Sequence, residues 1–334
     1  MRINRQTLCK IAEDTAAQRA RRERDLLSVY LCGSVLEGDY LLGGTTDIDL
    51  VFIHADTPAD EREIVRLTDD VHLDIAHFPQ KDFRQTRMLR LHPWLGPAIF
   101  GCKVLYDPQH FMDFTQASVR GQFERPDYVL ERARQQVDDA RQIWMSFYTD
   151  MPDQPGPQEL SLYLKAVEQA GNGLASLFGA PLTERRFLVN YRKRAETAGR
   201  PGLYAGILGL LGAQNVEVDA IQVWLAAWQV CLEALPSGKI PLRLHAARIP
   251  YYRRAFEAIL DSDQPLSVLW PLLSTWTAAI SYLPGDQDRT AAWHKACQYL
   301  GLLGGGFAER VEALDAYLDT VEEVLEDWGR ANGV

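Results

Sequence analysis

The chain has 334 residues, more than one ordinary domain and fewer than three, so we expect two domains. Hydrophobic residues at 47%, aromatic residues at 10% and charged residues at 24% exclude a disordered tail protein, a collagen-like fibre and a disulfide-rich miniprotein. The formal net charge of −10 opposes non-specific binding to a polyanion, so nucleic acid is not an expected partner.

Cysteine usage and hydropathy favour the cytoplasm. The five cysteines are odd in number and widely spaced, without a C-x-x-C pair, which predicts reduced thiols. The apolar run over residues 203–213 is too short to cross a bilayer, which needs about 20 residues. The chain begins with polar residues and no apolar stretch typical of a signal peptide. We therefore expect a cytoplasmic protein without a membrane partner, and the oligomeric state stays open.

The first third of the chain mixes strand-like runs with helical stretches. An amphipathic pattern predicts a helix over residues 5–27. Short apolar runs rich in β-branched and aromatic residues predict buried strands over residues 26–32, 47–55 and 71–78.

Nearly everything after Pro126 has helical period and helical length. Through Arg125 the chain holds 16 Lys and Arg against 19 Asp and Glu, and beyond it 19 against 26, a net charge of −7. The fold class is therefore α+β, with a small mixed-sheet domain over residues 1–115 followed by an all-helical bundle domain over residues 116–334. Helices are expected over residues 127–149, 158–178, 183–198, 201–211, 216–235, 251–260, 266–282, 290–303 and 308–332.

One stretch of the sequence contains candidate catalytic and metal-binding residues. A predicted strand ends in Gly33-Ser34, and some twelve residues later a second strand begins with Asp47-Ile-Asp49. Residues i and i+2 of a strand share one face about 6.6 Å apart, so both carboxylates can converge on small cations. A glycine at such a turn lets a phosphate approach the backbone. Asp74 lies within an otherwise apolar strand, where metal proximity would explain a buried charge.

These residues resemble the signature of the DNA polymerase beta nucleotidyltransferase superfamily: a hydrophobic residue with Gly-Ser, a spacer, an acidic pair in a strand and a later acid. Gly33, Ser34, Asp47, Asp49 and Asp74 match it, and the match covers about the first 110 residues. The following helical domain resembles that of the antibiotic nucleotidyltransferases of the kanamycin and streptomycin types.

The resemblance implies an enzyme that moves a nucleoside monophosphate from a nucleoside triphosphate to a hydroxyl and releases pyrophosphate. Asp47, Asp49 and Asp74 would bind two Mg²⁺ ions about 3.5 to 4 Å apart. Asp74 could also take the acceptor's proton, while Gly33 and Ser34 hold the β- and γ-phosphates. Family frequency favours ATP as the triphosphate.

The resemblance is looser in the helical domain. Lys165 and Glu168 lie one helical turn apart, as a phosphate-binding lysine and a base glutamate do in the kanamycin-type enzymes, but in reversed order. The alternative is an exposed ion pair. Arg185 and Arg186 open a basic segment that could reach the triphosphate or be solvated surface. His72 is a further candidate for facing the acidic site.

The acidic helical domain is the one indication of the acceptor. Its net charge of −7 suits a small cationic molecule such as an aminoglycoside. Three alternatives stay open: AMPylation of a protein partner, RNA tailing, which the acidic charge disfavours, and a catalytically inactive nucleotide-binding module.

Overall fold

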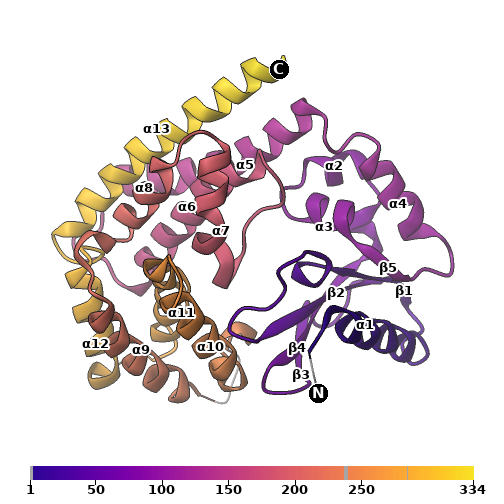
Figure 1. Ribbon diagram of the computed structural model, residues 1–334, viewed down its shortest axis with the longest axis horizontal. Helices are drawn as coiled ribbons and strands as arrows, with labels where there is room; N and C mark the ends of the chain where they lie inside the picture. Colours follow the sequence, from indigo (N-terminus) through magenta and orange to yellow (C-terminus); the bar gives the residue numbers. More distant parts are fainter. Residues whose placement is uncertain (1–2, 237–239, 284) are drawn as a thin grey trace. The chain divides into compact units, whose positions relative to one another are not determined.

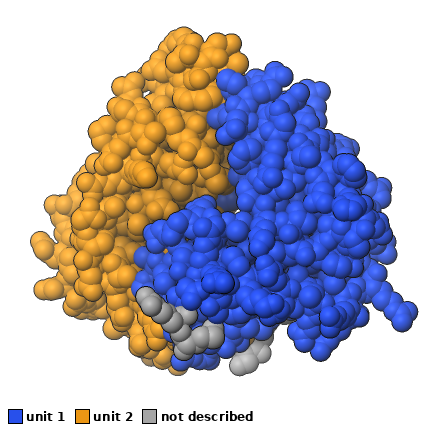
Figure 2. Space-filling view, turned by 45° about the vertical axis from the view of Figure 1, so that its right-hand side comes forward, with its two compact units in different colours: residues 1–129 blue, residues 130–334 orange. Residues whose placement is uncertain are grey.

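The computed structural model describes residues 3–236, 240–283 and 285–334 (Figure 1). The chain divides into two compact units, residues 1–129 and 130–334 (Figure 2). The first unit holds the β-sheet and the second is helical, which confirms the predicted α+β class. The boundary expected after residue 115 falls inside helix α4 (Phe111–Arg120), whose Met112 and Val119 are buried in the core of the sheet unit.

The sheet is mixed, as expected. In the part of the chain that the structure describes it has five strands in the order β3-β4-β2-β1-β5. Strands β2 and β4 are parallel, and the other neighbours are antiparallel. The strands are β1 (Leu26–Cys32), β2 (Thr46–His54), β3 (Arg62–Arg66), β4 (Val71–Pro79) and β5 (Lys103–Tyr106).

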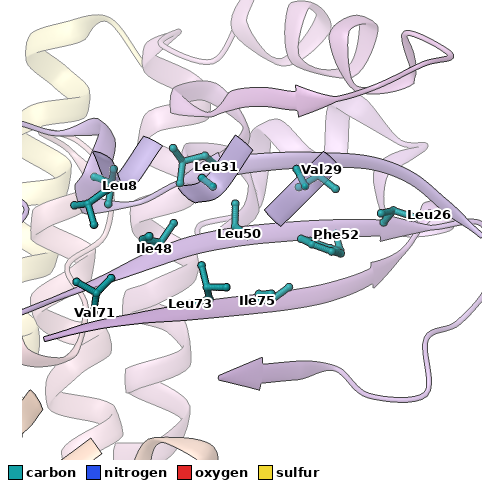
Figure 3. Close-up of a cluster of buried hydrophobic side chains, with 13 residues drawn as sticks. Leu8, Leu26, Val29, Leu31, Ile48, Leu50, Phe52, Val71, Leu73 and Ile75 are labelled. Carbon is teal, nitrogen blue, oxygen red and sulfur yellow. The ribbon is translucent and has the colours of Figure 1, made fainter. Parts of the chain in front are cut away.

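One face of the sheet is covered by helix α1 (Arg5–Ala20). Its buried residues pack against alternate residues of β1, β2 and β4, and fully burying each large apolar side chain contributes roughly 1.5–3 kcal/mol. Figure 3 shows this cluster, which includes Leu8, Leu31, Leu50 and Ile75.

The predicted extension of the first helix to residue 27 is wrong. The backbone N–H groups of Arg22 and Glu23 both donate to the carbonyl of Arg19, which closes the helix with a turn. Leu26 then starts β1 and is buried in the sheet core, so the apolar residues at the end of the helical pattern belong to a strand.

The opposite face of the sheet meets helices α2 (Thr86–Leu91), α3 (Leu95–Gly101) and α4. Val51 and Ile53 of β2 are buried in this second core, whereas Ile48 and Leu50 face α1. Because side chains alternate along a strand, Asp47 and Asp49 lie on the same face as Val51 and Ile53. This alternation fixes the direction in which the candidate carboxylates point.

The second unit is built from helices that agree with the predicted ones apart from shifts of one to a few residues at their ends. Its core is aromatic: Trp228 and Trp276 are fully buried, and the Trp228 indole N–H donates to Thr275 Oγ1 at 2.9 Å. None of the described helices is long and apolar enough to span a bilayer. They are α5 (Pro126–Thr149), α6 (Pro157–Ser176), α7 (Phe187–Thr197), α8 (Gly202–Leu210), α9 (Val218–Glu233), α10 (Ile249–Leu260), α11 (Leu269–Ile280), α12 (Gln287–Tyr299) and α13 (Gly306–Asn332).

Candidate active site

Three aspartates lie together on two adjacent strands of the first unit. In the parallel pairing of β2 with β4, Asp49 is directly opposite Asp74, and Asp47 is two residues before Asp49 on the same face. Neighbouring strands lie about 4.8 Å apart, so the side chains of Asp49 and Asp74 leave the sheet side by side. The structure thus brings together the three carboxylates that the sequence pattern singled out, and their role as metal ligands stays a prediction.

A tight turn before β4 sets the position of Asp74. The Thr68 hydroxyl accepts hydrogen bonds from the N–H groups of Asp70 and Val71, at 3.2 and 3.1 Å. The Asp70 carbonyl then accepts from the N–H of Thr46, the first residue of β2. This turn starts β4 level with β2, so that Thr46 pairs with Val71 and, three residues further along both strands, Asp49 pairs with Asp74.

Gly33 touches the carboxylate of Asp49. It follows β1, has φ 74° and ψ −161°, and precedes a short 3₁₀ turn, η1 (Ser34–Leu36). A Cβ atom at this position would lie 2.1 Å from Asp49 Oδ2, far inside van der Waals contact. Both the backbone conformation and the close approach therefore require glycine. The predicted Gly-Ser turn lies beside the predicted acidic pair.

Arg62 of strand β3 binds Asp74. Its Nε donates to Asp74 Oδ1 and its Nη2 to Asp74 Oδ2, both at 2.6 Å. This is the two-pronged geometry in which a guanidinium binds a carboxylate most strongly. Asp74 is 6% exposed, so Arg62 supplies positive charge to a nearly buried carboxylate. The nearly buried carboxylate of Asp74 is therefore stabilised by a positive charge beside it.

His72 and Cys32 flank the aspartates. His72 is opposite Asp47 in the parallel pairing, is fully buried, and its Nδ1 lies 4.0 Å from Asp47 Oδ1. Cys32 ends β1 opposite Asp49. Burial, followed by the negative charge of Asp49, raises the pKa of the Cys32 thiol well above its ordinary value. The thiol stays protonated at neutral pH, so it is not a nucleophile in this site.

The donor set suits a hard divalent cation. Carboxylate oxygens are the ligands that Mg²⁺ prefers, and the absence of a side chain at Gly33 leaves the Asp49 carboxylate room beside the turn. In residues 3–236, 240–283 and 285–334, no three His, Cys, Asp or Glu side chains are placed as a ready-made metal site. Both oxygens of Asp74 already accept a hydrogen bond from Arg62, so a cation shared with Asp49 would compete with this arginine for the charge of the carboxylate.

Glu168 lies in the second unit, on helix α6. Burial raises its pKa from 4.5 to about 7, and the charge of Glu184 adds to this effect, whereas Arg243 and Lys165 oppose it. Glu184 has φ 35°, a backbone conformation that residues with a side chain rarely adopt, and its Oε2 accepts a hydrogen bond from the Tyr252 hydroxyl at 3.2 Å. Glu168 therefore exchanges its proton near neutral pH, as a general base must.

The remaining candidates of the second unit differ in exposure. Lys165 is exposed on α6, one turn from Glu168. Arg185 is buried: its guanidinium lies 3.3 Å from the centre of the Tyr251 ring, and its Nη1 donates to the Tyr251 carbonyl at 3.1 Å. Arg186 is partly buried at the start of α7. The packing of Arg185 against Tyr251 gives it a structural role inside the unit, and triphosphate binding by either arginine stays a prediction.

Sequence reasoning missed Arg62, Cys32 and Glu184. Strand β3, which carries Arg62, has no apolar alternation because much of it is exposed, so no strand was predicted there. The turn-forming run Thr68 to Asp70 ahead of a predicted strand was the available signal of a hairpin, and a hairpin would have placed Arg62 beside β4.

No model of a known protein family matches this sequence, and no curated protein is significantly similar to it.

Proposed function

We propose that the protein is a nucleotidyltransferase that moves a nucleoside monophosphate, AMP for preference, from a nucleoside triphosphate to a hydroxyl of a small cationic acceptor. One observation carries the proposal. Asp49 and Asp74 lie side by side on adjacent parallel strands, with Asp47 on the same face and Gly33 in contact with Asp49.

The proposal gives the three aspartates and the Gly-Ser turn of the first unit separate roles in this reaction. Asp47, Asp49 and Asp74 would hold Mg²⁺, which when bound neutralises phosphate charge and lowers the pKa of the acceptor hydroxyl. The exposed Gly33 lets a triphosphate approach the backbone, and Ser34 offers a hydroxyl to the β- and γ-phosphates. Positioning of this kind provides most of the acceleration in phosphoryl transfer.

The reaction balances without a further co-reactant. The acceptor oxygen forms a bond to the α-phosphorus, and the bond between that phosphorus and the oxygen bridging to the β-phosphate breaks. Pyrophosphate leaves with the electron pair of that bond. The proton of the acceptor hydroxyl passes to a carboxylate, for which Asp74 and Glu168 are the two candidates. Asp74 belongs to the proposed metal site, and a pKa of about 7 would let Glu168 accept a proton near neutral pH.

The acceptor class rests on charge. Residues after Arg125 carry a net charge of −7, which favours cationic ligands such as aminoglycosides over polyanions. Lys165, Arg185 and Arg186 stay candidates for contacts with the triphosphate, and the burial of Arg185 makes it the weakest of the three.

The test is transfer of label from α-³²P nucleoside triphosphates to a panel of aminoglycosides in the presence of Mg²⁺. We expect a labelled small product, most of it from ATP, and loss of about 1000-fold or more of the rate in Asp49→Asn. Asp56→Asn is the matched control, because Asp56 is an exposed aspartate just beyond the same strand. A labelled protein band in lysate would instead favour AMPylation. Unlabelled acceptors with every triphosphate would contradict the small-molecule proposal.

A further inference from the structure

The ion pair between Arg62 and Asp74 places a cation where the proposed site needs a metal. Both oxygens of Asp74 accept from Arg62 at 2.6 Å, through Nε and Nη2. A divalent ion shared by Asp49 and Asp74 must take an oxygen of the same carboxylate. Two cations competing for one carboxylate repel each other, so binding of one weakens binding of the other.

The two partners differ in how easily they move. The Asp74 side chain is 7% exposed in the middle of β4, which is paired on both sides, with β2 and with β3. The Arg62 side chain is 58% exposed and belongs to β3, the edge strand of the sheet. Released from Asp74, the guanidinium regains water at small cost, since exposed charged groups are well hydrated. Asp74 stays in place, and Arg62 is the partner that leaves.

We propose that Arg62 is a latch: it occupies Asp74 in the resting protein, competes with the divalent cation for this carboxylate, and is displaced when metal and nucleotide bind. This inference rests on the proposed function, because it assigns Asp74 to the metal. According to this proposal, Arg62 lowers the affinity for metal in the absence of nucleotide, although Arg62 lies beside the proposed metal ligands.

The experiment is titration of Mn²⁺, followed by the electron paramagnetic resonance signal of the free ion, on the full chain without nucleotide. We expect Arg62→Gln to bind Mn²⁺ about tenfold more tightly than the unaltered protein. Arg62→Lys keeps the charge but loses the two-pronged geometry, so its affinity should fall between the two. Circular dichroism and thermal unfolding check that both variants fold.

Arg66→Gln is the matched control. Arg66 lies on the same strand and the same face, opposite His72, and its guanidinium pairs with Asp69. Removing its charge should change the Mn²⁺ affinity less than twofold. In a background of Asp74→Asn, replacing Arg62 should change the Mn²⁺ affinity much less than in the unaltered protein, because the carboxylate for which the two cations compete is gone.

Two outcomes would overturn the latch, and they are distinguishable. Unchanged or weaker Mn²⁺ binding in Arg62→Gln, at a site that Asp49→Asn abolishes, would mean that Arg62 orients Asp74 for the metal instead of excluding it; the proposed function would survive. If Asp49→Asn left Mn²⁺ binding unaltered, or if no variant bound Mn²⁺, the proposed metal site would be refuted. The proposed competition between Arg62 and the metal would then be refuted as well.

Discussion

Glu168 offers a test of the second unit that does not require the acceptor. Its pKa is raised from 4.5 to about 7, first by burial and second by Glu184. Between these two pH values the unfolded chain has lost the proton and the folded chain retains it, so the free energy of unfolding falls as pH rises. At 1.36 kcal/mol per pKa unit, the full shift corresponds to about 3 kcal/mol at pH 8.

Glu168→Gln removes this penalty, because the amide is close in shape to the protonated carboxyl and stays neutral. We expect the variant to match the unaltered protein at pH 4 and to exceed its stability by up to about 3 kcal/mol at pH 8. The assay is urea unfolding followed by tryptophan fluorescence, which reports mainly on the second unit since seven of the eight tryptophans follow Pro126.

Glu312→Gln is the control, because Glu312 is an exposed glutamate of helix α13. Its replacement should change the free energy of unfolding by less than about 0.5 kcal/mol at either pH. A Glu168→Gln variant whose advantage is the same at pH 4 and pH 8, or that is less stable at pH 8, would refute the assignment of a half-buried carboxyl that retains its proton. If the stabilised variant also loses transfer activity, Glu168 is retained for function at the expense of stability.

Two further predictions concern the first unit. Gly33→Ala should destabilise this unit by about 1–3 kcal/mol and weaken Mn²⁺ binding, because the added Cβ displaces Asp49. Gly44→Ala is the control, since Gly44 has the same φ of 74° but nothing within 4 Å of its Cβ, and it should leave the Mn²⁺ affinity unchanged. Equal effects of the two substitutions on Mn²⁺ affinity would contradict the contact between Gly33 and Asp49. Burial, and then the charge of His54, lowers the pKa of His77, so stability should fall as pH drops below about 6.5. His77→Gln should flatten the dependence of the unfolding midpoint on pH between 5 and 7, and an unaltered slope would show that His77 does not cause it.

The sequence predicted the elements that bury apolar surface. Strands β1, β2 and β4 lie within one residue of their expected ranges, since a run of buried residues in a short segment is a local signal. Strands β3 and β5 were not predicted. Strand β3 is largely exposed and β5 has four residues, so neither has a pattern that periodicity can detect.

In the candidate site, too, some features could be predicted from the sequence and others could not. Asp47 and Asp49 share a face because of the two-residue period of a strand, which sequence spacing reveals. The ion pair of Arg62 with Asp74 depends on the register between β3 and β4. The effect of Glu184 on Glu168 depends on tertiary packing that brings these two residues near each other. Neither register nor packing is encoded in the spacing of residues along the chain.

The most direct test of the proposed site is a crystal structure with Mn²⁺ and a non-hydrolysable ATP analogue, with the metal located by its anomalous scattering. We expect manganese among the carboxylates of Asp47, Asp49 and Asp74, the triphosphate against the backbone at Gly33, and Arg62 moved away from Asp74. Manganese and nucleotide bound elsewhere, with the two-pronged pair of Arg62 and Asp74 intact, would contradict both the proposed function and the latch.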